Sequence, residues 1–194
     1  MSSVCVGILA LQGAYEKHKE KCDWLGIDCV YVRSPEELQE CSHLIIPGGE
    51  STTISKLISI YGFRDELKRF SHEKYIWGTC AGMILLASRV DDSRIENLGL
   101  IDIHILRNGY GRQVDSFVTE EKLSFIEGDE KFRFIFIRAP KLLEYGDSVT
   151  VLGSINGDVV IARNKNILVS SFHPELTSDS RIHDYFINKM GENK

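Results

Sequence analysis

The strongest constraint on the fold of this chain is a regular alternation of strand-like and helical segments in its first half. Apolar or β-branched runs that read as strands lie at residues 4–11, 28–32, 44–46 and 75–79. Helical segments follow them at 14–25, 35–40, 52–60 with 64–72, and from Ala81 onward. This order is typical of a parallel sheet with helices on both faces. We therefore predict an α/β fold, a three-layer sandwich around a mainly parallel central sheet.

The second half has a different pattern, because after Leu98 the apolar segments become short and strand-like. These segments cover residues 100–106, 116–118, 132–137, 149–155, 158–162 and 167–172. Asn156-Gly157 between two of them is the strongest short hairpin signal. We expect antiparallel ribbons that return to the main sheet, then a last helix at 181–190. No repeat or linker divides the chain, so we predict one domain over residues 1–194.

Composition excludes several classes of protein. Hydrophobic residues make up 43% of the chain and charged residues 26%, as in soluble globular proteins, and the net charge of −5 argues against nucleic-acid binding. The apolar run 4–11 is too short to cross a membrane and has no basic residue before it, unlike a secretory signal. The five cysteines are odd in number and contain no Cys-x-x-Cys pair, so we expect no disulfide framework and a reducing, cytoplasmic location.

Three loops follow predicted strands at the same end of the sheet. They contain Gln12-Gly13, Gly48-Gly49 and Cys80. In open parallel sheets the ligand crevice lies beyond the carboxyl ends of the strands. We therefore expect these loops to meet at one cleft. The glycine pair either points backbone N–H groups into that cleft or forms an ordinary turn, with Ser51 as the N-cap of the next helix.

Cys80 lies in Gly78-Thr79-Cys80-Ala81-Gly82, between an apolar strand and an apolar helix. Gly-x-Cys-x-Gly has the spacing of a nucleophile elbow, which more often contains serine. A helix N-terminus favours the reactive thiolate. The alternative is a buried core cysteine, which is the usual role of a cysteine in a hydrophobic run. A nucleophile also needs a base, an orienting acid and oxyanion donors.

His173 and Glu175 can supply the base and the acid. His173 follows an apolar strand, and residues two apart in an extended segment point the same way, so Glu175 could hold one ring nitrogen. The alternatives are a surface pair or two metal ligands, although no further ligands stand at suitable spacing. The oxyanion donors would be the N–H groups of Gly49 and Ala81. For the other histidines (His18, His43, His72, His104 and His183) we expect structural or exposed positions.

These motifs resemble those of the class I (triad) glutamine amidotransferases, a flavodoxin-like α/β fold. Within that class the chain is similar to the PdxT/SNO family, the glutaminase subunits of pyridoxal 5'-phosphate synthase. The motifs that carry this resemblance run from Gly7 to Ala14, Pro47 to Thr53, Gly78 to Gly82, Gly111 to Phe117, Phe136 to Pro140 and His173 to Glu175. The resemblance implies hydrolysis of L-glutamine to glutamate and ammonia by Cys80, His173 and Glu175, without a cofactor or metal. It also implies transfer of ammonia to a (β/α)8-barrel synthase subunit in a large hetero-oligomer.

The resemblance assigns further residues by matching positions. Glutamine-binding positions match Gly48, Gly49, Glu50, Ser51, Arg107, Ile137 and Arg138, and Gln12 matches a position that orders the oxyanion loop. Structural salt bridges are the alternative for both arginines. Two features depart from the family pattern, Gly109-Tyr110 and Lys17. Other functions that the residues leave open are a different amidotransferase glutaminase, such as the imidazole glycerol phosphate synthase type, a stand-alone cysteine hydrolase and an inactive docking subunit.

Overall fold

The computed structural model describes residues 4–110, 116–126 and 128–191, and a seven-stranded sheet lies at its centre. Its order is β10-β11-β12-β4-β3-β1-β2, and the five strands from β12 to β2 are parallel. The strands are β1 (Val6–Leu9), β2 (Cys29–Val32), β3 (His43–Ile46), β4 (Tyr75–Thr79), β10 (Thr150–Ile155), β11 (Asp158–Arg163) and β12 (Ile167–Ser170). The antiparallel hairpin β10–β11 turns at Asn156-Gly157, as predicted.

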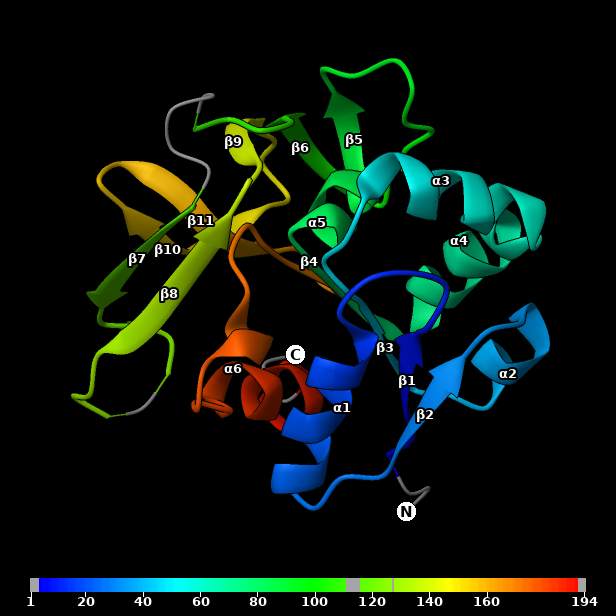
Figure 1. The fold of residues 1–194 in the computed structure, drawn as a ribbon, viewed down its shortest axis with the longest axis horizontal. Coiled ribbons are helices and arrows are strands. Elements are labelled where there is room, and N and C mark those ends of the chain that lie inside the picture. The colour runs from blue at the N-terminus through cyan, green and yellow to red at the C-terminus, as the bar shows by residue number, and fades with distance from the viewer. Residues whose placement is uncertain (1–3, 111–115, 127, 192–194) are drawn as a thin grey trace.

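Helices cover both faces of this sheet (Figure 1). On one face lie α2 (Pro35–Gln39), α3 (Ser51–Ile60), α4 (Phe63–Glu73) and α5 (Ala81–Leu86). On the other lie α1 (Tyr15–Trp24), α6 (Arg181–Asp184) and the π-helical stretch η2 (Tyr185–Lys189). Each face has its own hydrophobic cluster, which confirms the predicted three-layer α/β architecture. Within the described ranges, no helix has the length and apolar character that crossing a membrane requires.

Two small sheets flank the main one. One contains β5 (Ala87–Val90), β6 (Ile101–Leu106) and β9 (Lys141–Tyr145), and the other is the antiparallel pair β7 (Ser116–Glu121) and β8 (Phe132–Ile137). The sequence pattern did not predict β5 or β9. Alternate residues of β8 bury three phenylalanines, which pack with Phe172 at the end of the main sheet. The β7–β8 ribbon is thereby held beside the carboxyl ends of the central strands.

The start of α3 corrects one prediction. Ser51 is not the N-cap but the first helical residue, and it is buried. Glu50 is the N-cap, because its side chain folds back and accepts a hydrogen bond from the N–H of Thr53 at 2.8 Å. Of the motif that begins at Gly111, residues 111–115 lie outside the described part of the chain.

Candidate active site

Cys80 occupies the sharp turn between β4 and α5, where its backbone has φ 48° and ψ −101°. A positive φ in a residue other than glycine is strained and is concentrated at functional sites. A Cβ on Gly78 would lie 2.5 Å from the backbone of Gly82, and one on Gly82 would lie 2.2 Å from the carbonyl oxygen of Ile46. Both glycines are therefore needed for strand and helix to approach so closely, and the predicted strand–turn–helix is present.

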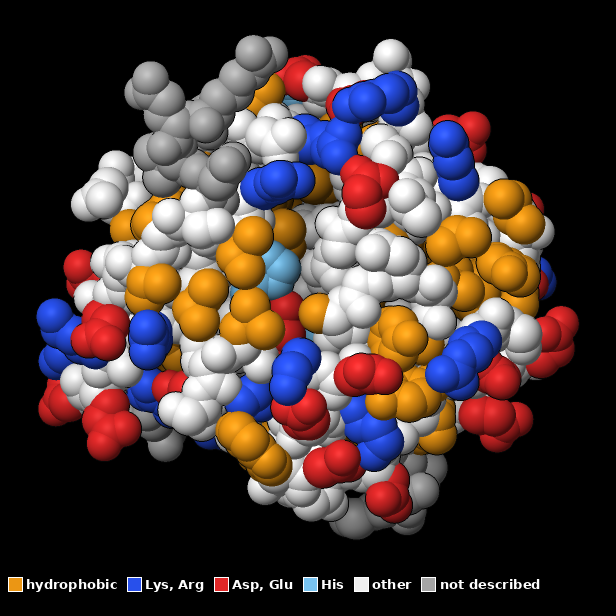
Figure 2. Space-filling model, in the orientation of Figure 1, with side chains coloured by type: hydrophobic (Ala, Val, Ile, Leu, Met, Phe, Trp, Pro, Cys, Tyr) orange, Lys and Arg blue, Asp and Glu red, His pale blue; other side chains and the backbone are white. Residues whose placement is uncertain are grey.

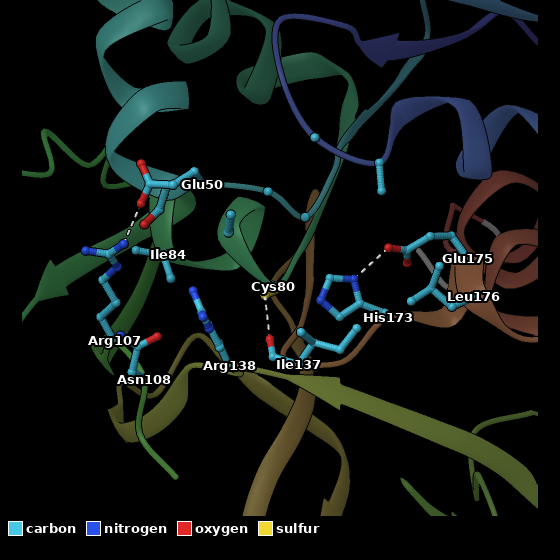
Figure 3. Close-up of a pocket in the computed structure, with 16 residues that line it drawn as sticks. Glu50, Cys80, Ile84, Arg107, Asn108, Ile137, Arg138, His173, Glu175 and Leu176 are labelled. Atoms are coloured by element: carbon cyan, nitrogen blue, oxygen red, sulfur yellow. Dashed lines mark hydrogen bonds and ion pairs between the residues drawn. The ribbon is translucent and has the colours of Figure 1, made fainter. Parts of the chain in front are cut away.

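His173 is brought to Cys80 by the order of the sheet. β12 lies next to β4 with Ser170 opposite Thr79, so the residues that follow both strands meet at the same edge. The backbone N–H of His173 is fixed to the carbonyl of Ile135 in β8 at 2.8 Å. Figure 3 shows the imidazole between Cys80 and Glu175, with the nitrogen that does not bond Glu175 on the Cys80 side. The thiol itself lies 3.8 Å from the carbonyl oxygen of Ile137.

Glu175 holds the other ring nitrogen, since its Oε1 lies 2.7 Å from Nδ1 of His173. The backbone conformation between His173 and Glu175 differs from the predicted one. Glu175 does not continue an extended strand but lies in the 3₁₀ turn Pro174–Leu176. Pro174 fixes φ at a value that suits the first position of such a turn, so the chain bends directly after His173. The carboxylate then reaches the ring from a turn, with the side chain completely buried.

Electrostatics favour a charged pair at this position. Burial alone would lower the pKa of His173, but hydrogen bonding with Cys80 and Glu175 and the charge of Glu175 outweigh it and raise the pKa to about 10. Burial alone would raise the pKa of Glu175, but the imidazoles of His18 and His173 outweigh it and lower that pKa. A raised pKa suits a group that accepts a proton.

The glycine loop after β3 is held against the loop after β1. The backbone N–H of Ala14 donates to the carbonyl of Gly48 at 2.9 Å, and the N–H of Glu50 donates to Oε1 of Gln12 at 2.8 Å. A trans peptide points its C=O and N–H in opposite directions. The contact with Ala14 therefore turns the N–H of Gly49 away from α1.

These loops surround one cavity of about 370 Å³, a volume suited to a small molecule. Gln12 does not line it and instead accepts a hydrogen bond from the backbone of Glu50. The other predicted site residues all line the cavity: Gly48, Gly49, Glu50, Ser51, Cys80, Ala81, Arg107, Ile137, Arg138, His173 and Glu175. Ile84, Asn108 and Leu176 also line the cavity and were not predicted. Figure 2 shows this region as a hollow with a histidine surface inside it, bordered by hydrophobic, basic and acidic side chains.

The two arginines of the cavity have different surroundings. Arg107 forms ion pairs with Glu50 at 2.5 Å and with Asp92 at 2.8 Å, so two carboxylates of the protein already bind its guanidinium. Arg138 is exposed, has a positive φ of 46°, and makes no ion pair with any residue of the described ranges. Its guanidinium is therefore the better placed of the two to meet a carboxylate of a ligand.

His18 in α1 is a site residue that sequence reasoning missed. It is fully buried, and its Nε2 lies 3.6 Å from Oε2 of Glu175. The available signal was the helical spacing that places His18 on the same inward side as Ala14 and Cys22. Among the residues with described positions, no group of three or more His, Cys, Asp or Glu side chains could hold a metal ion.

Comparisons with known proteins identify the family of this chain. The model of the SNO glutamine amidotransferase family matches residues 8–192. The pyridoxal 5'-phosphate synthase subunit PdxT of Thermosipho africanus is 48% identical over 95% of this chain and 98% of that protein. The PdxT of Carboxydothermus hydrogenoformans is 45% identical over 95% and 97%. A crystal structure of a glutamine amidotransferase superposes with a TM-score of 0.88 at 44% identity, covering 96% of this chain and 98% of that one. PurLQS from Thermotoga maritima, with a TM-score of 0.65 at 16% identity, shares the fold. The chain therefore belongs to the SNO glutamine amidotransferase family.

Proposed function

We propose that this chain is the glutaminase subunit of a pyridoxal 5'-phosphate synthase and that it hydrolyses L-glutamine to L-glutamate and ammonia. The observation that carries the proposal is the strained Cys80 beside the buried His173–Glu175 pair, at the edge of a small-molecule cavity. Two relatives named PdxT match nearly the whole chain at 45–48% identity. This similarity supports a subunit of pyridoxal 5'-phosphate synthase over a subunit of another amidotransferase.

In the first step the thiol proton of Cys80 passes to His173, and the sulfur attacks the side-chain carboxamide carbon of glutamine. The carbonyl oxygen becomes an oxyanion, for which we assign the N–H groups of Gly49 and Ala81 as donors. His173 then gives its proton to the leaving nitrogen. The C–N bond breaks, ammonia leaves, and a glutamyl thioester remains on Cys80.

In the second step water attacks the thioester. His173, now neutral, accepts a proton from the water, and the thiolate of Cys80 leaves as glutamate is released. Glu175 keeps the ring in one tautomer and stabilises its charged form through both steps. We assign Arg138 to the α-carboxylate of glutamine, with Arg107 and Glu50 as polar walls of the same cavity.

Ammonia must reach its acceptor before it is protonated. We therefore infer direct transfer to a (β/α)8-barrel synthase subunit, docked over the cavity in a large hetero-oligomer. The five cysteines are free thiols, which supports a reducing compartment, the cytoplasm.

The test is glutamate and ammonia release from glutamine, with and without a barrel synthase subunit of the same family. Cys80→Ala is expected to abolish release while leaving binding to the synthase intact. Cys22→Ala, a buried thiol in α1, is the matched control and should keep its activity. Release close to wild type by Cys80→Ala would reject Cys80 as the nucleophile.

A further inference from the structure

The buried carboxylate of Glu175 has one oxygen that the triad does not use. Oε1 accepts from His173, whereas Oε2 has no hydrogen-bond partner among the described residues. A buried carboxylate oxygen without a donor is costly. The group that faces it is Nε2 of His18, at 3.6 Å, a short shift away from a hydrogen bond.

The hydrogen-bond partners of His18 decide which of its nitrogens carries the proton. Its Nδ1 lies 2.9 Å from Nε2 of His183, and its Nε2 lies 3.3 Å from Oγ1 of Thr79. If the Nδ1 of His18 held the proton, its bare Nε2 would face the negative Oε2 of Glu175. His183 would then also bury an unpaired N–H, because its Nδ1 has no partner among the described residues. The opposite arrangement avoids both penalties. In it, Nε2–H of His183 donates to Nδ1 of His18, and Nε2–H of His18 points to Thr79 and Glu175.

The surroundings keep both rings in place and uncharged. His18 and His183 are fully buried, and the indole of Trp77 packs edge-on against each, with ring centroids 5.6 Å and 4.8 Å away. Burial lowers the pKa of His18 to about 4, although Glu175 opposes this, and the charges of His173 and Lys21 lower it further. Burial likewise lowers the pKa of His183, and His18 and Lys21 add to the effect. The ammonium of Lys21 is itself bound to the carbonyl of Thr177.

We propose that His18 is a positioning residue of the glutaminase. Its Nε2–H holds the second oxygen of Glu175, and the hydrogen bond from His183 to Nδ1 of His18 fixes the tautomer of His18 that carries this proton. The inference rests on the proposed function. In this arrangement the triad Cys80–His173–Glu175 continues through the neutral imidazoles of His18 and His183, from the cavity into the layer between the sheet and α1. With a donor on each oxygen, the carboxylate cannot rotate away from Nδ1 of His173.

A matched pair of substitutions separates this role from packing. His18→Met fills a similar volume without a donor, whereas His18→Gln carries an amide N–H near the position of Nε2. A hydrogen bond to a charged group changes an equilibrium by a factor of about ten to a hundred, and we take the same factor as the expected loss in kcat. We expect that loss for His18→Met, with KM for glutamine close to wild type because His18 does not line the cavity. His18→Gln is expected to recover most of the kcat.

His43→Met is the control for burying a methionine in place of a histidine. His43 is also buried, stacks on Tyr75, and starts β3 at the opposite ends of the strands from Cys80. Its kcat should stay at the wild-type value. All variants are assayed with the synthase subunit, below the unfolding temperature found for each by circular dichroism. Should His18→Met not fold, His183→Leu serves instead, since it removes the donor to Nδ1 of His18 and leaves Glu175 intact; its kcat is expected to fall.

Equal losses in His18→Gln and His18→Met, or a kcat of His18→Met like that of His43→Met, would overturn the proposal. A KM that rises while kcat stays constant would do the same. These results leave the glutaminase assignment standing, because that depends on wild-type hydrolysis and its loss in Cys80→Ala.

Discussion

Gly48 is the position where a single added methyl group should slow catalysis about a hundredfold while leaving the fold in place. A Cβ built on Gly48 would lie 2.5 Å from Cε1 of His173, 3.0 Å from its Nδ1 and 3.4 Å from Cβ of Cys80. Ordinary contacts begin at 3.4 Å. The imidazole, or the loop that carries Gly48, must therefore retreat by about 1 Å, and a misplacement of that size costs on the order of a hundredfold in rate.

The retreat acts on the contact that matters most for the base. Nδ1 of His173 lies 2.7 Å from Glu175 and would lie 3.0 Å from the added methyl group, so a retreat of the ring displaces the atom that makes this hydrogen bond. A shift of the loop instead would break the bond between Ala14 and Gly48 and displace the N–H of Gly49. Either response lowers kcat, so Gly48→Ala is expected to lose about a hundredfold in glutamine hydrolysis.

The assay is steady-state glutamate release with the synthase subunit present, together with thermal unfolding. Gly26→Ala is the control, because Gly26 has φ +68° and a methyl group added there would have no neighbour within 4 Å. That change costs stability through the backbone alone and should leave kcat unchanged. If Gly48→Ala keeps a kcat within about threefold of wild type, the imidazole does not occupy this position in the working enzyme and the reasoning fails.

Two further predictions concern the charged side of the cavity. Arg138→Ala should raise KM for glutamine about tenfold or more, with little change in unfolding temperature, since Arg138 makes no ion pair with the described residues; an unchanged KM in steady-state kinetics would contradict its assignment. Glu50→Gln should lower thermal stability at pH 7. Burial alone would raise the pKa of Glu50, but hydrogen bonds from Thr52 and Thr53 and the charge of Arg107 lower it to about 2. A carboxyl group whose pKa is lowered on folding stabilises the folded state at pH values above its ordinary pKa of 4.5. The stability difference between wild type and Glu50→Gln should therefore shrink as the pH falls from 4.5 toward 2. A stability difference that stays constant over this range, measured by circular dichroism, would refute that explanation.

The sequence predicts well those features that local chemistry determines. The two glycines that flank Cys80 indicate a close backbone approach, and therefore a sharp turn between strand and helix. The hairpin at Asn156-Gly157 follows from two residues that adopt positive φ readily. The parallel sheet follows from apolar strands alternating with helices. Because each loop of interest follows a strand, their meeting at one edge could be predicted without coordinates.

The features that the sequence does not reveal depend on contacts across the fold. β5 has a polar, half-exposed pattern and exists because β6 pairs with it. Glu50, rather than Ser51, caps α3 because Ser51 is buried at the helix start. His18 is far from Glu175 in the chain, and its helical spacing says only that it faces inward. Its neighbour across the interior depends on how α1 packs beside the turn that holds Glu175.

The interior position of β12 has a consequence for how the protein is made. Strands β2, β1, β3 and β4 are complete once residue 79 has been synthesised, but the neighbour of β4 is β12, which begins at residue 167. Until then a nascent chain carries an apolar strand edge open to pairing with other chains, a hazard for aggregation during translation. The pairing of β12 with β4 also brings the imidazole of His173 to the sulfur of Cys80. A ribosome-bound fragment that ends before β12 therefore cannot release ammonia from glutamine. Hydrolysis begins only when β12 has paired with β4.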